Sequence, residues 1–175
     1  TVINYNIEEI VKFTGGKLIN HNADLPSPSN LSLDSRKIIA AGNTIFFAIK
    51  SSHHDGNLFI EELYKKGVRN FVTSNKKIDI NQFPLANMIL VDNTITALQS
   101  LASYHRSRFE ALPVIGITGS NGKTIVKEWL YQLLETDFSI VKSPGSYNSQ
   151  VGVPLSVLNI NKSNTLGIFE AGISR

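Results

Sequence analysis

The sequence predicts an α/β protein in two parts: a small mixed α/β domain, then a parallel sheet with helices packed on its faces. Short apolar runs of strand length alternate with segments of helical periodicity along the whole chain. From Pro113 onward the order is strand, loop, helix, strand, helix, strand, which is typical of a parallel sheet. A glycine-rich turn at 118–124 joins the first of these strands to its helix. We place the domain boundary between residues 111 and 112, which gives the ranges 1–111 and 112–175.

The elements of the first part follow from local signals. Asn6 is a good cap for a first helix, and Gly15-Gly16 stops that helix. Apolar or β-rich runs predict strands at 17–20, 30–33, 44–49, 70–73 and 88–91. Further helices are predicted at 57–66, which ends at Gly67, and at 94–109.

The second part has the simpler pattern. Strands are predicted at 114–117, 139–141 and 166–169, and helices at 124–135 and 151–158. Strands joined by helices in this way run parallel in one sheet. The carboxyl ends of the strands then lie at one edge, where ligands of open α/β sheets bind.

Composition narrows the function classes. The 175 residues carry 17 Lys and Arg and 14 Asp and Glu, so the formal net charge is 17 − 14 = +3, without blocks of like charge that would favour nucleic acid or a membrane surface. The absence of cysteine excludes disulfides, thiol nucleophiles and cysteine-ligated zinc. No apolar run approaches the roughly 18 residues of a membrane helix, and residues 1–9 do not resemble a secretory signal. We expect a cytoplasmic protein with no nucleic-acid partner and no membrane insertion.

The strongest motif is the turn Thr118-Gly119-Ser120-Asn121-Gly122-Lys123-Thr124 between a strand and a helix. Backbone N–H groups of such a turn converge on a phosphate, and the helix dipole adds positive potential. Lys123 is then placed for the outer phosphates, and the Thr124 hydroxyl for Mg²⁺. The alternative is a glycine-rich turn that arises by chance, which the flanking strand and helix disfavour.

The spacing of this turn carries a family resemblance. Two residues separate Gly119 from Gly122, where the general P-loop has four. The short form T-G-S-N-G-K-T resembles the Mur ligase family and its folylpolyglutamate synthetase relatives. The resemblance implies that ATP, with Mg²⁺, converts a carboxylate into an acyl phosphate that an amine then attacks. It implies ATP binding by Gly119, Ser120, Asn121, Gly122, Lys123 and Thr124.

Two segments of the first part also resemble the family. Asp34-Ser35-Arg36 matches a D-S-R segment, and His54-Asp55 belongs to a matching strand, turn and helix entry. The resemblance implies that Asp34, Ser35, Arg36, His54 and Asp55 lie by the uridine diphosphate part of the substrate, so that 1–111 is a UDP-substrate domain. Taken alone, D-S-R is more often a turn with a solvated arginine. His53 and His54 lack a third ligand at metal-binding spacing.

The segment 143–155 separates members of the family. It resembles the N-N-x-x-G-x-P-L element of ligases that add D-alanyl-D-alanine to UDP-muramoyl-tripeptide in peptidoglycan synthesis, and Asn148 matches its first asparagine. Ser149 stands where the second asparagine is usual. The resemblance implies that Asn148 faces the reacting carboxylate and the γ-phosphate, as a catalytic residue together with Lys123. A ligase that adds the third peptide residue, and a non-catalytic nucleotide-binding module, remain the alternatives.

Glu170 completes the predicted site. It ends an apolar strand, so its carboxylate is expected in the crevice at the strand ends, and it matches the Mg²⁺-binding glutamate of the family. A solvated strand-end glutamate is the alternative. Thr124 and Glu170 are therefore the predicted metal ligands.

The resemblance covers essentially the whole chain, whereas complete members of the family continue beyond it. We therefore expect 112–175 to be the first part of a P-loop ATP-binding central domain and the chain alone to be inactive. The segment S-Y-N-S-Q and the ending F-E-A-G-I-S-R are similar to the form fused to an alanine racemase. A C-terminal racemase on the parent chain is therefore a further expectation.

Overall fold

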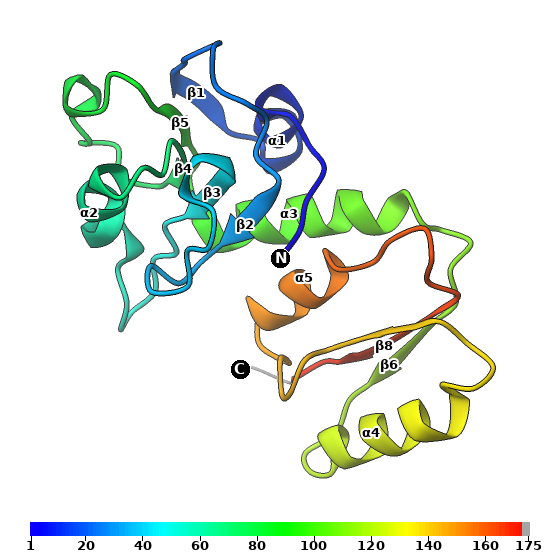
Figure 1. The fold of residues 1–175 in the computed structure, drawn as a ribbon. Helices are drawn as coiled ribbons and strands as arrows, with labels where there is room; N and C mark the ends of the chain where they lie inside the picture. Colours follow the sequence, from blue (N-terminus) through cyan, green and yellow to red (C-terminus); the bar gives the residue numbers. More distant parts are fainter. Residues whose placement is uncertain (173–175) are drawn as a thin grey trace. The chain divides into compact units, whose positions relative to one another are not determined.

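The chain divides into two compact units, Thr1–Leu101 and Ala102–Arg175, in a computed structural model that describes residues 1–172 (Figure 1). This division falls inside helix α3 (Thr94–Ser107), whereas the domain boundary predicted from the sequence, between 111 and 112, lies after that helix. Residues 173–175 of the F-E-A-G-I-S-R ending lie outside the described residues. The α/β class predicted from the sequence is confirmed, and no helix within 1–172 is long and apolar enough to span a bilayer.

The first unit contains a five-stranded sheet in the order β1-β5-β4-β3-β2. Its strands are β1 (Lys17–Asn20), β2 (Asn30–Ser32), β3 (Thr44–Phe47), β4 (Asn70–Thr73) and β5 (Asn87–Leu90). All neighbours pair in parallel except β1, which runs antiparallel to β5. The carboxyl ends of β2, β3, β4 and β5 therefore lie at one edge.

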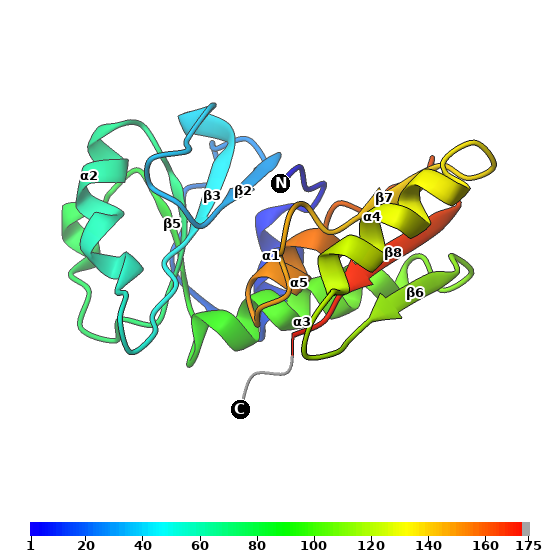
Figure 2. The ribbon, with the colours of Figure 1, turned by 90° about the horizontal axis from the view of Figure 1, so that it is seen from below.

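Alternating side chains of these strands build the core of the first unit. Phe46, Phe71 and Met88 are opposite one another on β3, β4 and β5, and all three are buried. They pack in one cluster with Ile60 and Leu63 of helix α2 (Ile60–Lys65). Figure 2 shows α2 on one face of the sheet and α1 (Ile7–Thr14) with α3 on the other.

The first helix has the ends that the sequence predicts. The Glu9 N–H donates to Asn6 Oδ1 at 2.8 Å and the Asn6 N–H to Glu9 Oε2 at 2.9 Å, which is a reciprocal capping box. Gly15 ends the helix in the left-handed conformation, with φ at 66°.

The predicted helix 57–66 is wrong at its start. A 3₁₀ turn (Gly56–Phe59) precedes α2. The Asp55 side chain accepts from the Asn57 N–H at 3.0 Å, and this short bond holds the tighter turn. A Cβ on Gly56 would lie 2.8 Å from the Ala48 carbonyl carbon, so the chain also needs glycine there to approach β3. Two other 3₁₀ turns, Ala41–Asn43 and Ile80–Gln82, lie outside the helices and strands predicted from the sequence.

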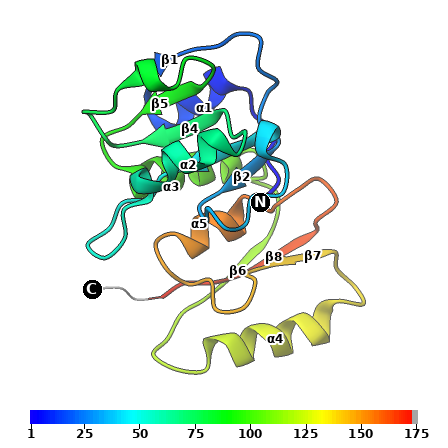
Figure 3. The ribbon, with the colours of Figure 1, turned by 60° about the vertical axis from the view of Figure 1, so that its left-hand side comes forward.

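The second unit contains a three-stranded parallel sheet, as predicted. Its strands are β6 (Val114–Ile117), β7 (Ile140–Lys142) and β8 (Leu166–Glu170), in the order β6-β8-β7. Helix α4 (Lys123–Leu134) lies on one face and α5 (Gly152–Val157) on the other (Figure 3). Leu130 and Leu134 of α4 pack with Ile168, whereas Val157 of α5 packs with Phe169. The last strand therefore lies at the centre of the sheet and faces both layers.

Candidate nucleotide-binding site

The turn between β6 and α4 has the backbone of an anion-binding loop. Gly119 and Gly122 have φ of 148° and 76°, in the region that favours glycine. A Cβ on Gly122 would meet nothing within 4 Å, so this glycine is needed for its conformation rather than for space. No side chain among the described residues caps the start of α4 at Gly122. The N–H groups of the first helical turn are therefore available to an anion.

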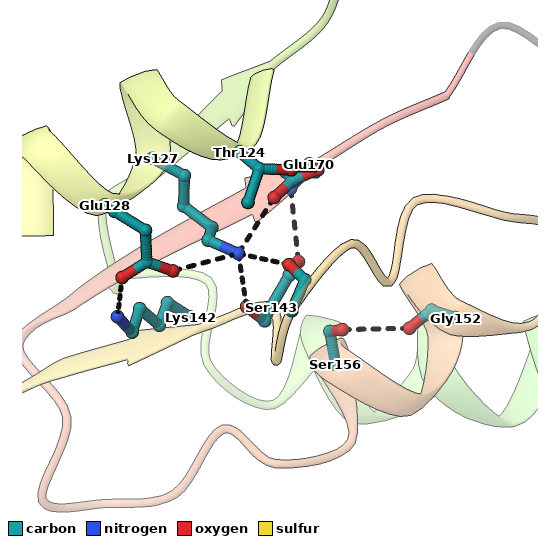
Figure 4. Close-up of polar contacts among 9 residues, drawn as sticks. Thr124, Lys127, Glu128, Lys142, Ser143, Gly152, Ser156 and Glu170 are labelled. Atoms are coloured by element: carbon teal, nitrogen blue, oxygen red, sulfur yellow. Dashed lines mark hydrogen bonds and ion pairs between the residues drawn. The ribbon is translucent and has the colours of Figure 1, made fainter. Parts of the chain in front are cut away.

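The last two side chains of the motif, Lys123 and Thr124, have different partners. Lys123 Nζ donates to Gly119 O at 2.6 Å, so the lysine folds back over the loop. The Thr124 hydroxyl donates to Glu170 Oε2 at 3.1 Å (Figure 4). The fold thus brings the predicted metal ligands Thr124 and Glu170 together from opposite ends of the second unit.

Glu170 is fully buried at the end of β8. Its Oε1 lies 2.8 Å from Lys127 Nζ, and its backbone N–H donates to Ser143 Oγ at 3.1 Å. A buried carboxylate requires such partners because burial removes its hydration. The carboxylate is therefore fixed between the Thr124 hydroxyl and the Lys127 ammonium group.

The donor set fits a magnesium ion bound with a nucleotide. The Thr124 hydroxyl and Glu170 Oε2 are adjacent hard oxygen donors. Within residues 1–172, no three or more His, Cys, Asp or Glu side chains gather as a metal cage. Mg²⁺ characteristically keeps several waters and binds through one or two protein oxygens plus phosphates, so two ligands from the chain are sufficient.

Asn148 lies beside the end of β8. Its carbonyl oxygen accepts from the Gly172 N–H at 2.7 Å, and a Cβ on Gly172 would lie 2.6 Å from that oxygen. The Ser149 hydroxyl accepts from the Gly152 N–H at 3.0 Å, which is the bond of a helix-capping residue. Ser149, the position that departs from the family pattern, therefore supports the start of α5.

In the first unit, Asp34 and Arg36 form a forked ion pair after β2. Arg36 Nε and Nη2 lie 2.9 and 3.0 Å from Asp34 Oδ1 and Oδ2. Hydrogen bonds from the Arg36 side chain and N–H lower the pKa of Asp34 to about 2. Arg36 is exposed and Ser35 is half-buried between the two. The guanidinium group therefore lies at the surface, held by its own neighbour.

Asp55 and His54 lie after the neighbouring strand β3. Lys50 Nζ is 3.4 Å from Asp55 Oδ2. Burial raises the pKa of Asp55, but hydrogen bonds from Asn57 and the charge of Lys50 outweigh it, so the pKa is lowered. His54 is exposed and stacks on Phe59 with ring centroids 5.9 Å apart. Because β2 and β3 are parallel neighbours, Asp34, Arg36, His54 and Asp55 follow strand ends at the same sheet edge.

Lys127 is the main polar residue of the site that the sequence does not reveal. It is fully buried, and its Nζ is surrounded by oxygens of Glu170, Glu128, Ser143 and Gly145. A lysine in V-K-E-W is expected to be solvated. The available signal is its place one turn after Lys123, which puts it on the helix face of the phosphate loop.

Comparison with known proteins agrees with this geometry. The model of the Mur ligase middle domain matches residues 117–175. The UDP-N-acetylmuramoyl-tripeptide–D-alanyl-D-alanine ligase of Bacillus subtilis is 33% identical over 171 residues, which is 97% of this chain and 35% of that protein. The chain thus spans about a third of the length of this relative.

Two solved structures have the same fold. MurF from Acinetobacter baumannii has a TM-score of 0.87 at 24% identity over 98% of this chain and 37% of that chain. MurF ligase from Thermotoga maritima, crystallised with ADP, has a TM-score of 0.67 at 31% identity over 88% of this chain and 34% of that chain. Because the middle-domain model matches and the Bacillus subtilis relative aligns over 97% of this chain, the chain belongs to the Mur ligase family.

Proposed function

We propose that the full-length protein is an ATP-dependent ligase that joins D-alanyl-D-alanine to UDP-N-acetylmuramoyl-tripeptide in peptidoglycan precursor synthesis. The observation that carries the proposal is the phosphate loop with Thr124 and Glu170 in contact beside its helix. The name of the Bacillus subtilis relative supports the choice of substrates.

The reaction has two steps. An oxygen of the tripeptide carboxylate attacks the γ-phosphorus of ATP, the bond to the β,γ-bridging oxygen breaks, and ADP leaves with the electron pair. The amine of D-alanyl-D-alanine then attacks the acyl carbon, phosphate leaves, and the nitrogen loses one proton to become an amide. Positioning and charge stabilisation supply the rate, so no side chain acts as a nucleophile.

In this proposal, the loop 119–122 and the first N–H groups of α4 bind the ATP phosphates. Lys123 exchanges its 2.6 Å hydrogen bond to Gly119 O for contacts with the β- and γ-phosphates. Its positive charge there offsets the negative charge that develops during phosphoryl transfer. Thr124 and Glu170 hold Mg²⁺, which neutralises phosphate charge when bound. Asn148, tethered beside Glu170 through the Gly172 N–H, orients the substrate carboxylate.

The first unit holds the other end of the substrate. Arg36 suits a pyrophosphate because a guanidinium group binds phosphate oxygens in pairs. Ser35, Asp34, His54 and Asp55 supply hydroxyl, carboxylate and ring groups for the uridine. We place the reaction in the cytoplasm, the compartment that supplies ATP.

The test is ADP release by the full-length protein with Mg-ATP and UDP-muramoyl-tripeptide, with and without D-alanyl-D-alanine. Release that depends on the dipeptide, and not on single amino acids, is the expected result. Release with a single amino acid and UDP-muramoyl-dipeptide would instead identify a third-residue ligase. ATP binding without release for any amine would leave only a nucleotide-binding module.

Two narrower proposals accompany this one. Residues 1–175 alone are expected to give no ADP release, because the chain spans about a third of the length of the Bacillus subtilis relative. An alanine racemase on the same polypeptide is tested by the racemisation of L-alanine by the full-length protein.

A further inference from the structure

The ammonium group of Lys127 is an unusual feature of the second unit. The side chain is fully buried, and its Nζ donates to Ser143 O at 2.9 Å and to Gly145 O. It also lies 2.8 Å from Glu170 Oε1 and 3.3 Å from Glu128 Oε1 (Figure 4). Two of the three ammonium protons are therefore donated to backbone carbonyls, and the contacts with Glu170 and Glu128 are ion pairs.

These contacts connect three segments that are far apart in the sequence. Lys127 belongs to α4, one turn after the phosphate loop, while Ser143 and Gly145 form the turn that follows β7. Glu170 ends β8. The same turn leads directly into Asn148, whose carbonyl oxygen is bonded to the Gly172 N–H at 2.7 Å.

Apart from Lys127, the turn is attached at its two ends to β8 and the residues after it: the Ser143 N–H donates to Ile168 O at 3.1 Å, and Asn148 O accepts from the Gly172 N–H at 2.7 Å. Pro144, Gly145 and Ser146 are exposed. The backbone bonds of Tyr147 to Pro144 O and of Asn148 to Ser146 O are local and connect the turn only to itself. Gly145 has φ of 53°, in the left-handed region. Lys127 therefore supplies the connection from the phosphate-binding helix to this exposed segment.

We propose that Lys127 is a positioning residue that fixes the segment 143–148 and the Glu170 carboxylate to the nucleotide-binding helix. Lys127 thereby connects the segment that carries Asn148 to the helix of the phosphate loop, in addition to the bond of Asn148 O to the Gly172 N–H. The structural part stands on the contacts alone, whereas its effect on turnover rests on the function proposed above.

Hydrogen–deuterium exchange of the full-length protein, without nucleotide or metal, tests the structural part. In Lys127→Met, the amides of 145–149 are expected to exchange about tenfold faster or more, because hydrogen bonds from a charged donor are lost. Lys142→Met is the matched control. Lys142 pairs with Glu128 and lies over the Tyr131 ring at 3.7 Å from its centroid, so its loss removes a neighbouring charge without freeing the turn.

A second pair of variants distinguishes the effect of Lys127 on the turn from its effect on the Glu170 carboxylate. The pair also controls for misfolding, because Lys127→Met leaves Glu170 buried without its cation. Glu170→Gln keeps the bonds from Lys127 to Ser143 O and Gly145 O, so exchange in 145–149 should stay near the wild-type rate. The double variant Lys127→Met with Glu170→Gln leaves no unpaired buried charge and should exchange as fast as Lys127→Met. Unchanged exchange in the double variant would overturn the proposal.

Steady-state kinetics test the effect on turnover. Lys127→Met should lower kcat at least about tenfold, because small misplacements of reacting groups are costly. Its Kd for ADP in EDTA should stay within about twofold of wild type, because the phosphate loop is intact. Lys127→Arg, which keeps a cationic donor, should recover part of kcat. Wild-type kcat in Lys127→Met would overturn the inference, whereas an inactive wild type would overturn the proposed function and leave the exchange result standing.

Discussion

Single side chains of this protein owe their roles to the partners that the fold places beside them. Thr124 is a helical threonine and Glu170 a strand-end glutamate, and they become candidate metal ligands because the fold places their oxygens 3.1 Å apart. Lys123 donates to the Gly119 carbonyl oxygen at 2.6 Å, a neutral partner that a phosphate oxygen can replace. The role proposed for each of these side chains therefore depends on its partners as well as on its residue type.

Replacing Lys123 with alanine should remove ATP turnover without unfolding the protein. A preorganised charge at the transferred phosphate is worth roughly 10²–10³ in kcat. The measurement is kcat for ADP release together with the melting temperature. Lys162→Ala removes an exposed lysine of the same unit and should retain kcat. Equal kcat values in the two variants would contradict the assignment of Lys123 to the phosphates.

The pair of Asp34 and Arg36 predicts a measurable pH dependence. Arg36 lowers the pKa of Asp34 to about 2, so at pH 3 the carboxyl should stay ionised in the wild type. In Arg36→Gln the pKa should return towards about 3.9, and the group should be largely protonated at pH 3. The stabilisation from this pair is present above pH 4 and is lost as the pH falls through about 2.

Carbon-13 NMR of the Asp34 carboxyl follows this titration directly. Lys37→Gln removes a neighbouring charge but leaves both hydrogen bonds of the fork, and it should shift the titration much less. Identical titrations in Arg36→Gln and in the wild type would show that the fork does not form in solution.

The positions of the site residues could be predicted from sequence only in part. The motif at 118–124 and the strand-end position of Glu170 were visible in the sequence, and the structure places Thr124 and Glu170 in contact, while the roles assigned to them stay predictions. Lys127 was not predicted, because its burial depends on Glu170 and on the carbonyls of Ser143 and Gly145. The sequence around Lys127 does not indicate partners that lie so far away along the chain.

Whole helices and strands show where local signals suffice. The capping box of Asn6 and Glu9 and the left-handed Gly15 define α1 within its own segment. The start of α2 was misplaced because Asp55 and Gly56 impose a 3₁₀ turn through contact with β3. Strand positions were predictable from apolar runs, but the order of strands in each sheet was not.

Gly56 allows a prediction about element packing. In Gly56→Ala the new Cβ would lie 2.8 Å from the Ala48 carbonyl carbon and from the Ile49 nitrogen, which are backbone atoms that cannot rotate away. We expect the free energy of unfolding to fall by about 1–3 kcal/mol, as for other overpacked sites. Chemical denaturation measures this change.

Gly42→Ala is the matched control for this experiment. A Cβ on Gly42 meets nothing within 4 Å, so the free energy of unfolding should change by less than about 0.5 kcal/mol. If both variants lost the same stability, the close approach at Gly56 would not be the cause.

At the scale of the molecule, two compact units carry two different candidate sites. Asp34, Arg36, His54 and Asp55 lie in Thr1–Leu101, and the phosphate loop lies in Ala102–Arg175. The assignment of UDP to the first and ATP to the second is a prediction, since one sheet edge with charged loops does not by itself select a nucleotide.

Ligand protection tests this division. Mg-ADP should slow hydrogen exchange in 118–126, whereas UDP should slow it in 33–37 and 51–57. At a ligand concentration 100 times Kd, local protection should approach about 100-fold, which corresponds to about 2.7 kcal/mol. Protection of the same unit by both ligands would contradict the division, and ligand-free exchange of each segment is the control.

The central place of β8 has a consequence for synthesis on the ribosome. β6 and β7 each pair with β8 and not with one another. A nascent chain that has emerged only as far as α5 therefore holds two strands with no sheet between them, and the Thr124 hydroxyl has no carboxylate to meet. The contact of the Thr124 hydroxyl with the Glu170 carboxylate can form only after Leu166–Glu170 has been synthesised. Because both earlier strands have β8 as their neighbour, the sheet of the second unit cannot be completed until this last strand is available.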